Sequence, residues 1–132
     1  MMAWYDPKID WASNEEMSAS AWNEIIYDAE YILDAIGETV RADTVIGYLI
    51  PSGQTILFLP LEWWDTLRRY LYDANITLGV SDIEVPTDDM TAEQLNRMER
   101  LLWLAWLKIG QIGARLYTND PIYTGDPDIY AR

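Results

Sequence analysis

The sequence predicts a single, mostly helical α+β domain with about three helices, one β-hairpin and extended arms at both ends. Apolar residues recur at helical spacing in three stretches, two β-rich runs flank a turn-type tetrapeptide, and 132 residues, half of them apolar, suffice for one core. We expect residues 1–17 to form an extended, aromatic entry segment. Residues 18–115 would form a helical core with the hairpin at 44–59, and 116–132 a C-terminal arm.

Two of the predicted helices begin with the same pattern, which indicates an internal duplication of a capped helix. Residues 15–37 read EEMSASAWNEIIYDAEYILDAIG, and residues 88–110, which lie 73 positions later, read DDMTAEQLNRMERLLWLAWLKIG. A repeated supersecondary unit usually marks scaffold rather than chemistry. The repeated positions, after an acidic pair, are Met17, Ser18, Trp22, Asn23 and Gly37, then Met90, Thr91, Leu95, Asn96 and Gly110.

Each copy contains the signals of a helix start. Ser18 and Thr91 are N-cap residues, and Gln94 completes a capping box in the second copy. Met17 precedes the cap Ser18, and Trp22 follows that cap by four positions. Met90 and Leu95 have the same places around Thr91, and this is the spacing of a hydrophobic staple.

The other repeated positions concern the helix interior and the helix end. Gly37 and Gly110 suit the left-handed residue after a helix, unless the second helix continues toward Arg115. Asn23 and Asn96 are either ligand contacts or amides that bond the backbone of the preceding loop. We favour the structural role, because a duplicated position tends to do the same work in both copies.

The predicted elements follow the spacing of apolar residues. Helices are expected at about 19–36, with Asp28 on the solvent side, at about 61–75, and at about 92–109. The runs Thr44–Ile50 and Thr55–Leu59 predict two strands. Neither run alternates, so helices or a neighbouring subunit would have to cover both faces of the hairpin.

The last helix and the arm are the candidate interface. The helix is apolar on most sides, which is typical of a central helix or of one covered by a partner. We expect a partner on the face of Trp103, Trp106 and Leu107. The arm repeats an Asp-Pro phrase followed by Tyr123 and by Tyr130, and these tyrosines could lie on a neighbouring surface.

Composition narrows the classes of function. The chain contains no Cys and no His, so thiolate and histidine chemistry is excluded, and we expect no catalytic residues, no cofactor and no metal. Direct nucleic-acid binding is not expected at a net charge of −13, and no apolar run is long enough to span a membrane. Acidic residues dominate the first copy and basic residues the second, which could attract each other within or between chains.

Two short motifs resemble a known group of proteins. Asp6-Pro7-Lys8-x-Asp10-Trp11 and the segment Thr91-Ala92-x-x-Leu95-Asn96-Arg97-Met98-Glu99 are similar to segments of small tail- or baseplate-associated structural proteins of phages infecting Gram-positive bacteria. The first copy departs from the pattern at Glu24 and Ile26. The resemblance covers about a third of the chain and implies a virion part, without catalytic residues.

The preferred hypothesis is therefore a structural protein of a phage tail, connector or baseplate that is not an enzyme. It would be located in the virion after assembly in the host cytoplasm, and its partners would be other virion proteins or copies of itself. One alternative is an acidic phage-encoded inhibitor of a host defence protein that mimics nucleic acid. Another is a carbohydrate-binding module that uses Trp and Tyr platforms.

Overall fold

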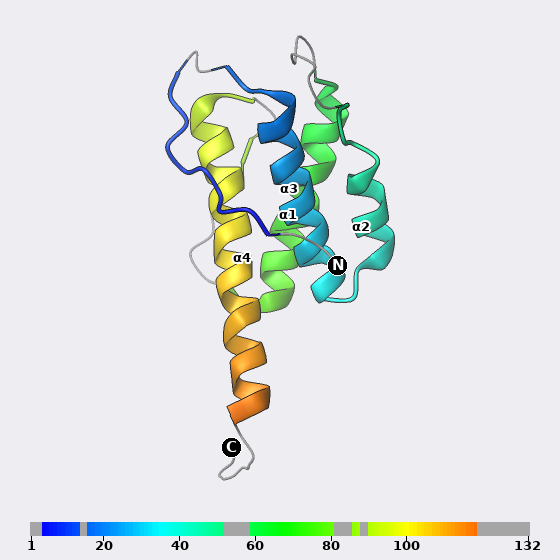
Figure 1. The fold of residues 1–132 in the computed structure, drawn as a ribbon, viewed down its shortest axis with the longest axis vertical. Helices are drawn as coiled ribbons and strands as arrows, with labels where there is room; N and C mark the ends of the chain where they lie inside the picture. The colour runs from blue at the N-terminus through cyan, green and yellow to red at the C-terminus, as the bar shows by residue number, and fades with distance from the viewer. Residues whose placement is uncertain (1–3, 14–15, 52–58, 81–85, 88–89, 119–132) are drawn as a thin grey trace.

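A computed structural model describes residues 4–13, 16–51, 59–80, 86–87 and 90–118, with side chains as far as Gln111. The described residues form four helices, and Figure 1 shows α1, α3 and α4 side by side with α2 beside α1. Helices α1 and α3 each contact the other three helices, whereas α2 and α4 lie on opposite sides of them without contact. The prediction of a mostly helical fold is confirmed, but the α+β class with about three helices is wrong, because the described residues form four helices and no strand. The helices are α1 (Ala19–Ala35), α2 (Thr39–Ile46), α3 (Leu61–Leu78) and α4 (Ala92–Thr118).

The predicted β-hairpin at 44–59 is wrong. Residues 44–46 are the last turn of α2, residues 47–51 form no strand, and no strand occurs elsewhere in the described parts of the chain. The β-branched residues misled the prediction, because only Ala42 and Val45 of α2 are buried, three positions apart on one helix face. Most of the second predicted strand, 55–58, lies outside the described residues.

The core lies between the helices and is built from the residues that the helical spacing predicts. Trp22, Ile26 and Leu33 of α1 and Leu67 and Leu71 of α3 are fully buried. Each such side chain contributes roughly 1.5–3 kcal/mol through the apolar surface that it removes from water. Helix α4 adds five residues to this core: Leu95, Met98, Leu101, Leu102 and Ala105.

The caps are mostly as expected. The Ser18 hydroxyl accepts from the Ala21 N–H at 3.1 Å, and the Thr91 hydroxyl accepts from the Gln94 N–H at 3.2 Å. In the predicted capping box the Gln94 side chain would bond the N–H of Thr91. Instead, Gln94 Oε1 accepts from the Thr87 N–H at 2.7 Å. Met17 and Met90 are half-buried against the core that includes Trp22 and Leu95.

The glycines of the two copies differ. Gly37 follows α1 with a φ of 83°, so the prediction of a left-handed residue is confirmed there. At Gly110 the alternative of a continuing helix is confirmed, because α4 runs through it to Thr118. Gly79, which has a φ of 77°, is the left-handed residue that ends α3.

The N-terminal strap, which we define as residues 4–13, contains no helix and runs along α4 and α1 (Figure 1). At the other end of the chain, α4 includes the first residues of the predicted arm, 116–118, so an extended arm from 116 is wrong for those residues. Tyr123 and Tyr130 lie outside the described residues.

Candidate functional site

Two asparagine clamps hold distant backbone segments against α1 and α4. The Ile50 N–H donates to Asn23 Oδ1 at 2.8 Å, and Asn23 Nδ2 donates to the Ile50 carbonyl at 2.7 Å. In the second copy the Trp11 N–H donates to Asn96 Oδ1 at 2.7 Å, and Asn96 Nδ2 donates to the Trp11 carbonyl at 3.1 Å. The duplicated amides therefore have the same structural role. They differ from the expectation in one respect, since the clamped segments lie 27 and 85 residues away and are not the preceding loops.

Indole groups support the same connecting segments. Trp22 Nε1 donates to the Tyr48 carbonyl at 2.9 Å, and Trp64 Nε1 donates to the Thr87 carbonyl at 2.7 Å. The Tyr48 ring also stacks on Trp63, with 4.9 Å between the ring centroids. Buried tryptophans usually need a partner for the N–H, and here backbone carbonyls outside the helices supply it. Residues 48–50 are thus held against α1 by side chains, without a sheet.

Glu99 of α4 anchors the middle and the end of the N-terminal strap. The Lys8 N–H donates to Glu99 Oε1 at 2.8 Å, and the Trp11 indole N–H donates to Glu99 Oε2. Only 4% of Glu99 is exposed. Burial raises its pKa from 4.5 to about 7, against the opposing effect of the two N–H donors.

Asp28 of α1 anchors the beginning of the strap. It was expected on the solvent side of its helix, but it is 1% exposed, and the Tyr5 N–H donates to its Oδ1 at 2.8 Å. Burial raises the pKa of Asp28 from 3.8 to about 8, the Tyr5 N–H opposes this, and the charge of Glu99 raises it further. Two buried carboxyls from neighbouring helices therefore lie beneath one strap, and the charge of Glu99 acts on Asp28.

The two motifs that resemble segments of phage proteins contact each other in the fold. The strap residues Lys8 and Trp11 belong to the first motif, and Asn96 and Glu99, which bind them, belong to the second. Leu95 and Met98 are buried in the core, and Arg97 pairs with Glu93 at 2.9 Å. These contacts give the motif residues a structural role.

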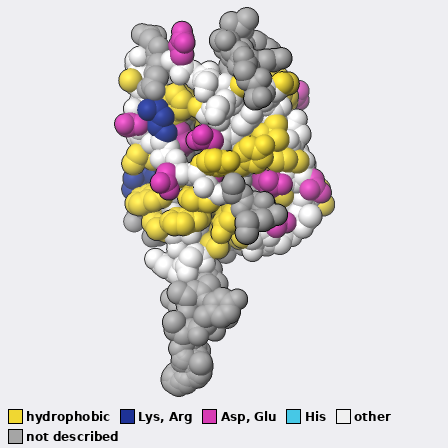
Figure 2. All heavy atoms as spheres, viewed as in Figure 1, with side chains coloured by type: hydrophobic (Ala, Val, Ile, Leu, Met, Phe, Trp, Pro, Cys, Tyr) yellow, Lys and Arg dark blue, Asp and Glu magenta, His cyan; other side chains and the backbone are white. Residues whose placement is uncertain are grey.

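An aromatic cluster lies where the strap begins, on the face formed by α1 and α4. Trp4 stacks on Trp106 with ring centroids 5.2 Å apart and tilts against Tyr31 at 5.7 Å. Tyr5 and Tyr27 form a further tilted pair at 6.1 Å. Figure 2 shows hydrophobic side chains gathered in bands on this face, with acidic side chains between them. Trp106, one of the predicted interface residues, is thus covered by the strap of its own chain.

The other predicted interface residues on α4 remain accessible. Trp103 is 38% exposed and Leu107 is 36% exposed. They lie four positions apart, so they project from the same side of the helix. Next to them, the end of α3 and this part of α4 border a shallow hollow of about 240 Å³ lined by Gly79, Val80, Leu104, Leu107, Lys108 and Gln111.

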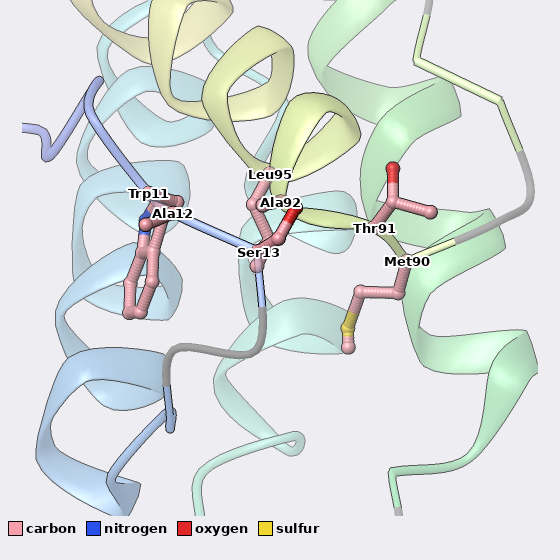
Figure 3. Close-up of a pocket in the computed structure, with 7 residues that line it drawn as sticks. All are labelled: Trp11, Ala12, Ser13, Met90, Thr91, Ala92 and Leu95. Atoms are coloured by element: carbon pink, nitrogen blue, oxygen red, sulfur yellow. The ribbon is translucent and has the colours of Figure 1, made fainter.

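A second hollow, of about 400 Å³, lies where the strap ends and α4 begins (Figure 3). Its lining carries no charged side chain, and the Thr91 hydroxyl there already caps α4. Such a surface has no group for acid–base or nucleophilic chemistry beyond two hydroxyls. The lining residues are Trp11, Ala12, Ser13, Met90, Thr91, Ala92 and Leu95.

The described part of the chain holds no group of three or more metal-ligating side chains. None of its helices combines the length and the hydropathy that crossing a bilayer requires.

Sequence reasoning missed the two buried carboxyls. Asp28 lies three positions after Ile25 and four before Ile32, both buried, and this spacing was the available signal that it faces inward. Glu99 is likewise flanked on its helix by buried Met98 and Leu102. Comparison with protein-family models, with curated proteins and with solved structures finds no match.

Proposed function

We propose that this protein is a structural component of a phage particle, in the tail, connector or baseplate, and that it acts by binding other proteins. The resemblance of the strap and α4 motifs to small tail-associated proteins supports the virion setting. In the described residues the buried carboxyls and the duplicated amides are engaged with the chain's own backbone, which leaves them no evident role in catalysis.

The observation that carries the proposal is the form of α4. It has 27 residues, against 17 in α1 and 18 in α3, so it exceeds them by roughly 14 Å at the usual rise per residue. Figure 1 shows its C-terminal part extending beyond the other helices. Trp103 and Leu107 are exposed just before this extension. A projecting helix with exposed aromatic and aliphatic side chains is a suitable surface for a protein partner.

The two alternative functions gain less support. A nucleic-acid mimic needs a continuous row of carboxylates, but on the face in Figure 2 the acidic side chains are separated by hydrophobic ones. A sugar platform needs an open aromatic ring, and of the seven tryptophans, all within the described residues, only Trp103 is exposed. Trp4 and Trp106 present ring faces to each other.

The proposal is tested by light scattering at low and at high salt. We expect the wild-type protein to form a defined oligomer of the 15.3-kDa chain, or to bind a purified particle protein, and the double variant Trp103→Ser/Leu107→Ser to remain a monomer that binds nothing. The matched control is Val40→Ser/Ile76→Ser, which removes two exposed apolar residues from α2 and α3 and should behave as wild type.

Two results would contradict the proposal. If both double variants assemble and bind as the wild type does, the α4 face is not the interface. If mass spectrometry of purified particles of a phage that encodes the chain finds no copy of it, the virion assignment is wrong.

A further inference from the structure

The N-terminal strap is fastened at three points by two carboxyl groups that can ionise. Asp28 of α1 accepts from the Tyr5 N–H, and Glu99 of α4 accepts from the Lys8 N–H and from the Trp11 indole. Both carboxyls are almost completely buried. The fourth fastening, the Asn96 amide on Trp11, does not titrate.

The charged groups that act on this pair are mostly acidic. Glu24 of α1 acts on both carboxyls, and Asp6 of the strap acts on Asp28. Lys8 is the cation that acts on Glu99, and its ammonium group also pairs with Asp10 at 3.1 Å. If both buried carboxyls ionise, two negative charges are added to a poorly hydrated layer that already faces negative neighbours.

We propose that the strap is a pH-dependent latch, which lies closed on α1 and α4 while Asp28 and Glu99 hold protons and opens locally when both carboxyls ionise. Opening lets water reach the carboxylates, so it relieves the cost of burying them. Since burial raises the pKa values to about 8 for Asp28 and about 7 for Glu99, the closed strap loses stability as pH rises from about 5 to about 8.

Opening the latch would enlarge the candidate interface. Trp4 lies on Trp106, and release of the strap separates these stacked rings. Trp106 lies three positions after Trp103 and one before Leu107, next to the exposed α4 face. This consequence rests on the proposed function, whereas the latch itself does not.

The latch is tested by native-state amide exchange measured by NMR between pH 6 and pH 8.5, expressed as protection factors. We expect the protection of the Tyr5, Lys8 and Trp11 amides to fall by up to about tenfold per pH unit for each carboxyl. The contribution of Glu99 should end near pH 7 and that of Asp28 near pH 8. These amides should exchange with little dependence on low urea concentrations, while those of Leu67 and Leu71 in the core exchange only through urea-dependent global unfolding.

Substitutions separate ionisation from other effects of pH. In Asp28→Asn/Glu99→Gln neither side chain can ionise, so strap protection should not change with pH up to pH 8.5. Its level should be lower than in the wild type at pH 6, because the glutamine keeps one acceptor oxygen for the two N–H donors that Glu99 binds. Asp43→Asn, an exposed change on α2, should keep the wild-type profile. If the double variant does not fold, Asp28→Asn alone should halve the pH slope, and Trp11→Phe should lower strap protection at every pH.

The latch is wrong if the strap amides are as protected as the core amides, or if the double variant keeps the wild-type pH dependence. Light scattering at pH 8.5 then separates the two proposals. A strap that opens without any change in assembly relative to the double variant leaves the latch standing and argues against α4 as the interface.

Discussion

The two asparagine clamps allow one prediction to be tested twice within a single chain. Asn23→Ala and Asn96→Ala each remove a pair of hydrogen bonds to one backbone residue, Ile50 or Trp11. If the amides were ligand contacts instead, truncation would leave the free energy of unfolding unchanged or slightly raise it, because Ala is the better helix former.

The magnitude follows from the contacts. Two hydrogen bonds contribute about 2 kcal/mol, and replacing Asn by Ala inside a helix returns about 0.5 kcal/mol. We therefore expect each variant to lose about 1.5 kcal/mol, which corresponds to a fall in Tm of roughly 5 °C for a domain of this size. The clamps share no partner, so the double variant should lose about 3 kcal/mol.

Urea denaturation followed by tryptophan fluorescence measures these values, since five of the seven tryptophans are at least partly buried in or against the core. The control is Gln111→Ala, an exposed change on α4 that should alter stability by less than about 0.5 kcal/mol. Losses below that limit in both Asn variants would refute the clamps. A loss in only one variant would refute their equivalence.

The remaining predictions concern pH and glycine. Because the folded pKa values of Asp28 and Glu99 are raised to about 8 and about 7, the folded state binds protons that the unfolded chain has released, so stability falls as pH rises from about 5 to about 8. The slope is at most about 1.4 kcal/mol per pH unit for each carboxyl, and urea titrations that show rising stability would contradict it. Gly79→Ala should destabilise the fold by about 1 kcal/mol, because this residue has a φ of 77°. Gly110→Ala should stabilise it by about 0.5 kcal/mol, because the position is helical and nothing lies within 4 Å of the added Cβ. Thermal melts that give the opposite order of stability would contradict both expectations.

The sequence by itself determined the features that depend on neighbouring residues. Ser18 and Thr91 cap helices because their hydroxyls reach a backbone N–H three residues ahead. The apolar spacing located α1, α3 and α4, because a helix repeats its buried face every three to four residues. Helix α2 was not predicted, because its β-branched residues favour a strand and only two of its positions are buried.

The tertiary structure alone decided what covers these helices. Nothing near Asn96 indicates that its partner is Trp11, 85 residues earlier, and nothing near Asp28 indicates that the strap lies over it. Such pairings depend on how distant segments meet, and local spacing does not encode that choice. The raised pKa values of the two carboxyls follow from the same burial, so they too depend on the tertiary structure and not on neighbouring residues in the sequence.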